Sequence, residues 1–282
     1  MDAAEIAQIR WADPSRIADA LRSRPAPEPY HGKLLVIAAD HPARGALTVG
    51  DRVNAMADRS DLLQRIDTAL SRPGVHGFLG TADLVEDLAL MGSLDGKLVY
   101  GSMNRGGLAG AAFEMDDRFT GYTVPGIVEA GLDGGKMLLR VDPDDPGSVA
   151  TLESTAHAVS ALADARRIAM VEPFMSRRTN GKVVNDLSTE AVVKSIAIAS
   201  GLGASSAYTW LKIPCADDMA RVASSTTLPL LVLGGDVASG SEDRWIAALA
   251  QPTVRGLVIG RSLLYPPDDD VTAAVDRVAA LT

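Results

Sequence analysis

Short apolar runs alternate with amphipathic stretches along almost the whole chain. Eight of the apolar runs are rich in β-favouring residues and are bounded by Gly, Pro or Asp, as expected for strands buried on both faces. These predicted strands cover residues 33–40, 75–80, 97–104, 135–142, 167–174, 207–214, 229–236 and 254–260. Between them, Ala, Leu, Ile and Val recur at spacings of three and four, which predicts helices, most clearly at residues 61–70, 148–163 and 189–200.

Eight alternating strand–helix units in about 250 residues predict one (β/α)8 TIM barrel of the α/β class. We expect the barrel over residues 33–282 and a helical extension over residues 1–32, which closes the barrel bottom or meets a partner chain. The alternative fold is a doubly wound sheet. It is disfavoured because the chain has no GxGxxG or Walker motif, and the first strand is followed by Asp-His-Pro-Ala-Arg-Gly at residues 40–45.

Composition narrows the classes of function. The 282 residues carry a net charge of −9, which provides no basic field for nucleic acid, so that an anionic ligand must be held by local donors. The single cysteine, Cys215, excludes an internal disulfide, and four histidines fit a three-histidine zinc site poorly, so no metal is expected. We see no signal peptide and no apolar run of membrane-spanning length, and therefore expect a cytoplasmic protein without a membrane partner.

Lys212 is the residue with the clearest chemical potential. It stands in an apolar run, Tyr-Thr-Trp-Leu-Lys-Ile-Pro at residues 208–214, near the end of the sixth predicted strand, where barrel enzymes have their active sites. A buried lysine tends to lose its proton and become an amine nucleophile, which predicts a Schiff base with a carbonyl substrate. The alternative is a lysine whose stem lies along the core while its ammonium group reaches water.

Alternation of side chains along the strands places further groups beside Lys212. Lys136 and Arg140 share one face of the fourth predicted strand, and Glu172 ends the fifth. Glu172 and Asp40, which ends the first strand, are candidates for proton transfer on the imine, and each has as its alternative a salt bridge with a lysine. Lys136 should lie deeper than Lys212 and act as the neighbouring cation that activates it.

Glycine turns follow the seventh and eighth predicted strands, where many barrels bind phosphate through backbone N–H groups. The candidates for phosphate binding are Gly234, Gly235, Gly260 and Arg261, although ordinary turns also contain glycine. Further substrate-binding candidates near the predicted mouth are His41, Arg44, Arg105, Arg177 and Arg178. One or two of these arginines are expected to bind a second anionic group, such as a carboxylate; the alternative is that they are exposed loop residues.

Together these segments resemble the class I (Schiff-base) aldolases of the DeoC/LacD type across residues 33–265. The matching pieces are Asp40, Gly-Lys-Met-Leu-Leu at residues 135–139, Glu-Pro at 172–173, Leu-Lys-Ile-Pro at 211–214 and Gly-Arg-Ser at 260–262. The resemblance implies a Schiff base on Lys212, proton transfer by Glu172, assistance from Lys136 and Asp40, and phosphate binding by the glycine turns and Arg261. It also implies a homo-oligomer that acts on a small phosphorylated carbonyl compound without a cofactor.

More narrowly, the chain is similar to a branch found in actinobacterial myo-inositol catabolic clusters. This resemblance implies cleavage of 6-phospho-5-dehydro-2-deoxygluconate to dihydroxyacetone phosphate and malonate semialdehyde. The chain departs from better-known members in Lys-Ile-Pro-Cys at residues 212–215, in the loop at residues 40–45 and in Ser-Arg-Arg at residues 176–178, which leaves the substrate open. Two other functions also stay open: a sugar-phosphate isomerase or decarboxylase, and a non-catalytic sugar-phosphate sensor.

Overall fold

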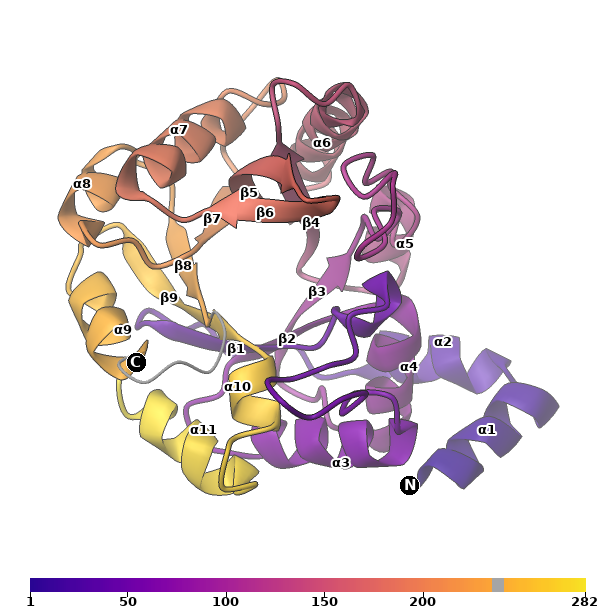
Figure 1. The fold of residues 1–282 in the computed structure, drawn as a ribbon. Helices are drawn as coiled ribbons and strands as arrows, with labels where there is room; N and C mark the ends of the chain where they lie inside the picture. Colours follow the sequence, from indigo (N-terminus) through magenta and orange to yellow (C-terminus); the bar gives the residue numbers. More distant parts are fainter. Residues whose placement is uncertain (235–240) are drawn as a thin grey trace.

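The chain forms a closed barrel in the computed structural model, which describes residues 1–234 and 241–282 (Figure 1). Within these residues, the ring contains eight parallel strands: β1 (Leu34–Ala38), β2 (Gly77–Gly80), β3 (Leu98–Ser102), β4 (Gly134–Val141), β5 (Ile168–Thr179), β7 (Thr209–Ile213), β8 (Leu230–Leu233) and β9 (Val254–Ile259). Strand β1 pairs with both β2 and β9, and β4 pairs with β5, so the ring closes. The predicted (β/α)8 barrel is confirmed, and the doubly wound sheet is wrong.

Helices surround the barrel in the order that the periodicity predicts. They are α3 (Arg59–Leu70), α4 (Ala82–Met91), α5 (Val124–Glu129), α6 (Gly147–Asp164), α7 (Thr189–Ser200), α8 (Met219–Ser224), α9 (Ser241–Leu249) and α11 (Val271–Ala279). A short helix α10 (Arg261–Leu264) follows β9, and a 3-10 turn η1 (Pro42–Arg44) follows β1. Side-chain caps fix several of these starts; for example, Asp58 accepts a hydrogen bond from the backbone N–H of the third residue of α3, and Ser188 does the same for α7. Among the described helices, none is long and apolar enough to cross a membrane.

Alternation along the strands divides the core into two parts. Leu34, Val36, Tyr100, Met170 and Leu231 belong to a buried cluster inside the lower barrel. The residues between them on the strands belong to the larger cluster that packs against the helices. Because side chains alternate along a strand, the next inward-facing residue on each strand is two residues further along. These residues point into the upper barrel.

The N-terminal helices α1 (Ala3–Ala12) and α2 (Ser15–Ser23) lie beside the barrel and not beneath it (Figure 1). Helix α2 packs against α4, and Arg10 of α1 forms an ion pair of 2.8 Å with Asp87 on α4. The segment between α2 and β1 runs past the strand starts, where Arg24 donates to the carbonyl oxygens of Lys97 and Gly131. Of the two predicted roles of the extension, closure of the barrel bottom by these helices does not agree with this arrangement, and contact with a partner chain stays a prediction.

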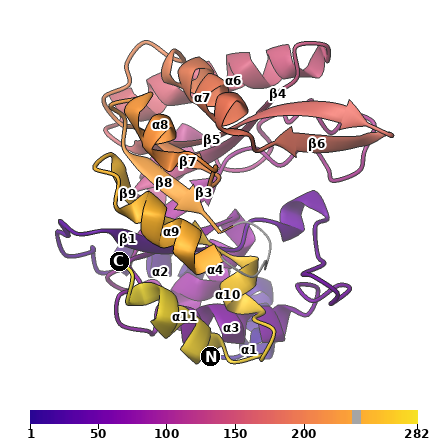
Figure 2. The ribbon, with the colours of Figure 1, turned by 60° about the vertical axis from the view of Figure 1, so that its left-hand side comes forward.

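Strand β5 continues beyond the barrel and forms an antiparallel hairpin with β6 (Lys182–Asp186). Figure 2 shows this hairpin standing out from the ring. The two turn residues, Asn180 and Gly181, have φ angles of 51° and 77°, as a two-residue hairpin turn of the I′ type requires. The prediction that the fifth strand ends at residue 174 is wrong, because the hairpin extends the sheet by several residues.

Candidate active site

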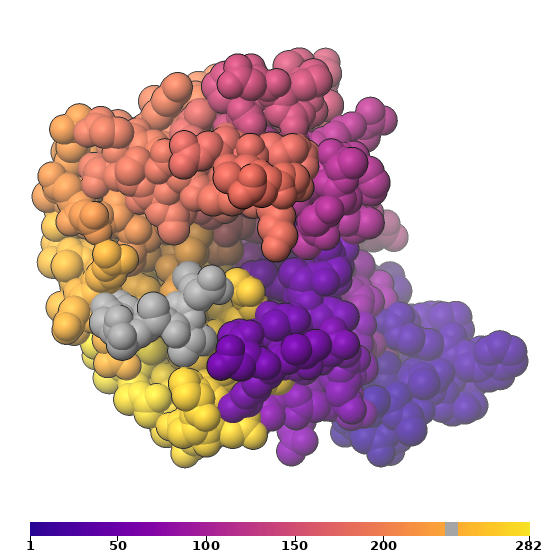
Figure 3. All heavy atoms as spheres, in the orientation of Figure 1, coloured from indigo at the N-terminus to yellow at the C-terminus, as the bar shows by residue number. Residues whose placement is uncertain are grey.

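A cavity of about 740 Å³ opens at the C-terminal ends of the strands. Figure 3 shows the hollow between the β5–β6 hairpin and the segment after β1. The hairpin contributes Phe174, Val183, Asn185 and Leu187 to its wall. The cavity therefore lies where a barrel presents its functional residues.

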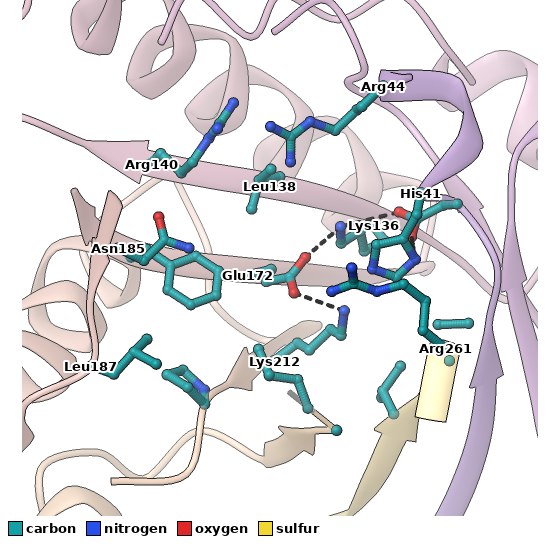
Figure 4. A pocket seen from close by; sticks show the side chains of 18 of the residues that line it. His41, Arg44, Lys136, Leu138, Arg140, Glu172, Asn185, Leu187, Lys212 and Arg261 are labelled. Atoms are coloured by element: carbon teal, nitrogen blue, oxygen red, sulfur yellow. Dashed lines mark hydrogen bonds and ion pairs between the residues drawn. The ribbon is translucent and has the colours of Figure 1, made fainter. Parts of the chain in front are cut away.

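Three charged side chains meet at the base of this cavity (Figure 4). The Nζ atom of Lys212 donates to Oε1 of Glu172 at 2.7 Å, and the Nζ atom of Lys136 forms an ion pair with Oε2 of the same carboxylate. Met170 on β5 lies opposite Trp210 on β7, so Glu172, two residues further along β5, is level with Lys212. Lys136 on β4 lies opposite Met170 and is therefore two residues lower than Glu172. The side chains of Lys136 and Lys212 are 1% and 5% exposed, so the expectation that Lys136 lies deeper agrees with this geometry.

Burial and charge act in opposite directions on these groups. Burial alone raises the pKa of Glu172, but the charges and hydrogen bonds of the two lysines outweigh it and hold this pKa below its usual range. Burial, with the positive charges of Arg105 and Lys212, lowers the pKa of Lys136 well below its ordinary value, although Glu172 opposes the shift. Glu172 is therefore ionised in the free protein, and a neutral amine is accessible beside it.

Asp40 extends this group through the other side of Lys136. Its Oδ2 atom accepts hydrogen bonds from Lys136 and from Ser102, both at 3.1 Å, and it forms an ion pair with Arg105. The pKa of Arg105 is lowered by burial to about 10, which still leaves the guanidinium charged at neutral pH. We call Asp40, Arg105, Lys136, Glu172 and Lys212 the central cluster.

Counting charge in the central cluster indicates that one amine is neutral. Two carboxylates face one guanidinium and two lysines, so the cluster is balanced when one lysine has lost its proton. Burial favours loss of the proton from Lys136. Lys136 and Lys212 contact the two oxygens of Glu172, so a neutral amine lies within one carboxylate of Lys212.

His41 lies at the edge of the central cluster, on the loop after β1. Its Nδ1 atom is 3.9 Å from Asp40 and makes no hydrogen bond within the described part of the chain. Burial, together with the cations Arg261 and Lys212, lowers the pKa of His41 to about 3. At neutral pH the imidazole is uncharged and can donate or accept one hydrogen bond to a ligand.

The predicted phosphate site lies partly within the described residues. Gly234, Gly260 and Arg261 line the cavity, whereas Gly235 lies outside the residues that the structure describes. Close packing accounts for both described glycines, because a Cβ on Gly260 would overlap the carbonyl oxygen of Ala38 and one on Gly234 would overlap Ile259. The glycines are thus explained without a ligand, and the case for an anion here depends on the charged lining.

A second charged group lies higher in the cavity. Oε1 of Glu114 accepts from Nη1 of Arg140 at 2.6 Å and from Nη2 of Arg44 at 3.0 Å. Alternation along β4 predicts that Arg140 faces inward, and it lines the cavity together with Arg44 and Glu114. We call Arg44, Glu114 and Arg140 the rim cluster. Figure 4 shows Arg44 and Arg140 side by side, beyond Leu138 from the lysines.

Two of the predicted substrate-binding residues lie elsewhere. Arg177 is exposed on the hairpin, and Arg178 donates to the carbonyl oxygen of Ala112 at 3.0 Å; neither is among the residues that line the cavity. The reason is the unexpected extension of β5, which carries both side chains past the mouth. Of the candidates near the mouth, His41, Arg44 and Arg105 do line the cavity.

Sequence reasoning missed Glu114 and the hairpin wall. The loop that carries Glu114, between β3 and α5, has no periodicity that could place its side chains. The sequence does contain a signal for the hairpin, because Asn180-Gly181 between β-favouring residues is typical of a two-residue turn. Among the described residues, no group of three or more His, Cys, Asp or Glu side chains could hold a metal ion.

Comparison with known proteins places the chain in a family. Its fold is shared with an archaeal fructose 1,6-bisphosphate aldolase, which is 18% identical with a TM-score of 0.63 over 94% of this chain and 98% of that one. A Schiff base-forming fructose-1,6-bisphosphate aldolase is 19% identical, with a TM-score of 0.61 over 94% of this chain and 99% of that one. At these identities the likeness shows the fold alone.

A much closer likeness is found to Cgl0159 from Corynebacterium glutamicum. That structure is 54% identical with a TM-score of 0.96, and the match covers 99% of this chain and 95% of that one. A search of the curated proteins finds no match. A family model described as Cgl0159-like matches residues 32–279, and the chain therefore belongs to the Cgl0159-like family.

Proposed function

We propose that the protein is a class I aldolase that cleaves or forms a C–C bond of a phosphorylated keto sugar or keto-acid sugar. The observation that carries the proposal is the placement of two buried amines on the two oxygens of Glu172, at the base of a cavity. A balanced central cluster holds one neutral amine, which is what attack on a carbonyl requires.

Lys212 is the amine that we assign as nucleophile. It is level with the cavity base and has one carboxylate partner, whereas Lys136 is one step lower and has two. Lys212 attacks the substrate carbonyl to give a carbinolamine, which loses water to a protonated imine. That imine accepts the electron pair of the breaking C–C bond, and the resulting enamine is protonated and hydrolysed.

Glu172 is the residue that we assign to proton transfer. In the free protein both lysines bind it and keep it weakly basic. Once Lys212 becomes a neutral carbinolamine nitrogen, Glu172 loses one ion pair and becomes a stronger base, so it can take a proton from a substrate hydroxyl. Asp40, already bound by three groups, is assigned to holding Lys136 and Arg105 in place.

Anionic substrates suit the charges around the cavity. Among its described lining residues, seven are Lys or Arg and three are Asp or Glu, in a chain with a net charge of −9. Gly260 and Arg261, which follow β9, line the cavity. We place the phosphate there. The named substrate, 6-phospho-5-dehydro-2-deoxygluconate, and a role in inositol catabolism are supported by the sequence resemblance alone.

Borohydride trapping tests the proposal. The protein is incubated with dihydroxyacetone phosphate and borohydride and examined by intact mass and peptide mapping, beside Lys212→Ala and the control Lys194→Ala, which removes an exposed amine on α7. We expect an adduct on Lys212 that Lys212→Ala abolishes and Lys194→Ala preserves, with an activity loss of at least about 1,000-fold in Lys212→Ala.

Other outcomes separate the parts of the proposal. An adduct on Lys136 keeps the imine chemistry but makes the assignment of Lys212 wrong. If neither dihydroxyacetone phosphate nor a panel of other phosphorylated ketones leaves an adduct, the aldolase proposal fails.

A further inference from the structure

His41 lies on the loop after β1, between the central cluster and the turn that follows β9. Figure 4 shows its imidazole between Lys136 and Arg261. The side chain is 29% exposed, and it belongs to the lining of the cavity. A ketone bound to Lys212 with its phosphate at Arg261 would therefore pass beside the imidazole.

Packing fixes the orientation of this ring. Its Nδ1 atom is buried and lies 3.9 Å from Oδ1 of Asp40. On the neighbouring side, the absence of a side chain at Gly260 makes room for Cε1, since a Cβ atom there would lie 3.5 Å from it. Because Nδ1 is covered, Nε2 is the ring nitrogen of His41 that can face the cavity.

The charges around His41 determine which nitrogen carries the proton. Burial and the cations Arg261 and Lys212, which line the cavity, lower the pKa of His41 to about 3, so the ring is neutral and holds one proton. The carboxylate of Asp40 lies next to Nδ1 and attracts that proton. Nε2 then presents a lone pair to the cavity.

An open acceptor is scarce at the base of the cavity. The two lysines and Arg105 can only donate hydrogen bonds. Both oxygens of Glu172 are bound by the lysines, and the side chain of Asp40 is only 2% exposed. Among the described residues, no hydrogen bond occupies Nε2 of His41. A substrate hydroxyl group, which must place its proton on an acceptor, therefore finds one at His41.

We propose that Nε2 of His41 accepts a hydrogen bond from the hydroxyl group on the carbon beside the imine carbon, so that His41 selects hydroxylated ketones over their deoxy analogues. This inference deepens the proposed aldolase function and rests on it. The role is separate from that of Glu172, which loses a lysine partner only when the imine forms. A site built to bind a hydroxyl group rejects the analogue that lacks it, because the acceptor then loses water without gaining a partner.

Two phosphorylated ketones test the inference. Dihydroxyacetone phosphate carries the hydroxyl group, and hydroxyacetone phosphate has a hydrogen atom in its place. Each ketone is titrated into the protein, the imine is trapped with borohydride, and the adduct on Lys212 is measured by intact mass. The decisive quantity is the ratio of the two concentrations that give half-maximal trapping, compared between variants, because the intrinsic reactivities of the ketones cancel in that comparison.

His41→Phe keeps a ring and removes both nitrogens. We expect it to raise the concentration for half-maximal trapping of dihydroxyacetone phosphate by about tenfold and to leave that of hydroxyacetone phosphate unchanged. A merely structural role of the imidazole would shift both ketones alike, and this outcome would overturn the inference. His157→Phe, at an exposed position on α6, is the matched control and should change neither value.

A second pair of variants tests which nitrogen acts and does not depend on the folding of His41→Phe. Glutamine can place its amide near the position of Nε2, whereas asparagine can place the same group only near Nδ1. His41→Gln should therefore keep most of the preference for the hydroxylated ketone, and His41→Asn should lose it. Equal ratios in these two variants would overturn the inference.

The same experiment separates this inference from the proposed function. Adducts on Lys212 whose ratio does not respond to the residue at position 41 would defeat this inference alone. If neither ketone leaves an adduct on the unaltered protein, both this inference and the trapping expected of the aldolase fail.

Discussion

The lower and upper halves of the barrel interior are built from the same strands and differ in almost every chemical respect. Below, Leu34, Tyr100, Met170 and Leu231 fill the ring with apolar side chains. Above, the central cluster fills it with five ionisable groups. On β5, one step of two residues separates buried Met170 from Glu172. The interior thus changes from apolar to charged along the strand axis, and the two kinds of lining meet where Lys136 and Lys212 lie opposite Met170 and Leu231.

The largest effect should come from leaving charge unpaired in the upper half. Glu172→Leu removes the shared partner of Lys136 and Lys212, and we expect the free energy of unfolding to fall by about 4 kcal/mol and the activity to be lost. Urea denaturation measures the change. Glu172→Gln, which keeps an acceptor oxygen, should lose activity but less stability. Equal unfolding midpoints for Glu172→Leu and the unaltered protein would show that the central cluster is not coupled to folding.

A substitution in the lower half should lower the stability of the protein without changing its chemistry. Leu34→Ala leaves a void in the apolar cluster at the start of β1, and we expect a loss of about 3 kcal/mol in the free energy of unfolding. The yield of trapped adduct on Lys212 should not change at temperatures where the variant is folded. Leu34→Met, which keeps most of the volume, serves as the control. A drop in adduct yield comparable with the loss of stability would contradict the separation of the two halves.

A smaller effect on the free energy of unfolding should appear at acidic pH. The pKa of Glu172 is lower in the folded protein than its ordinary value of 4.5, so the unfolded chain binds more protons as the pH falls below about 5. Its contribution to stability is complete above that range and is lost as the pH drops. We therefore expect the unfolding midpoint in urea to fall between pH 5 and pH 3 more steeply in the unaltered protein than in Glu172→Gln. Glu153→Gln, on the exposed face of α6, should keep the steep slope.

The smallest expected effect is a gain in the free energy of unfolding. The hydroxyl of Tyr100 is fully buried and has no hydrogen-bond partner among the described residues. Removing an unsatisfied polar atom from an apolar site is favourable, so Tyr100→Phe should raise the free energy of unfolding by about 1 kcal/mol and Tm by about 2–4 °C. Differential scanning calorimetry measures the gain, with the half-buried Tyr208→Phe as control. A loss of stability would indicate that a water molecule satisfies the hydroxyl.

The sequence alone predicts those residues of the upper half that lie on regular strands. Periodicity fixes the strands, alternation fixes which side chains face inward, and Lys136, Glu172 and Lys212 follow from those two rules. The position of the N-terminal helices could not be predicted, because an amphipathic pattern shows that a helix packs, but not on which neighbour it packs.

Loops limit the prediction of the candidate site. Glu114 is brought to Arg140 by an irregular loop that is held by backbone contacts such as Ala109 to Arg44, and these leave no pattern in the sequence. Arg177 and Arg178 lie beyond the predicted mouth because β5 continues past residue 174 to the Asn-Gly turn at residues 180–181. The inward-facing residues of the strands were therefore predictable from the sequence, whereas the side chains that the irregular β3–α5 loop brings to the cavity were not.

The β5–β6 hairpin has a consequence for the behaviour of the protein in concentrated solution. A closed barrel has no free strand edge, and β6 restores one, since it ends the sheet order among the described strands. Free edges invite pairing between molecules and are a route to aggregation. Here the edge is five residues long and is bracketed by charges at Lys182 and Asp186, which oppose such pairing. Substitutions that neutralise these two ends would turn a wall of the cavity into a self-association hazard.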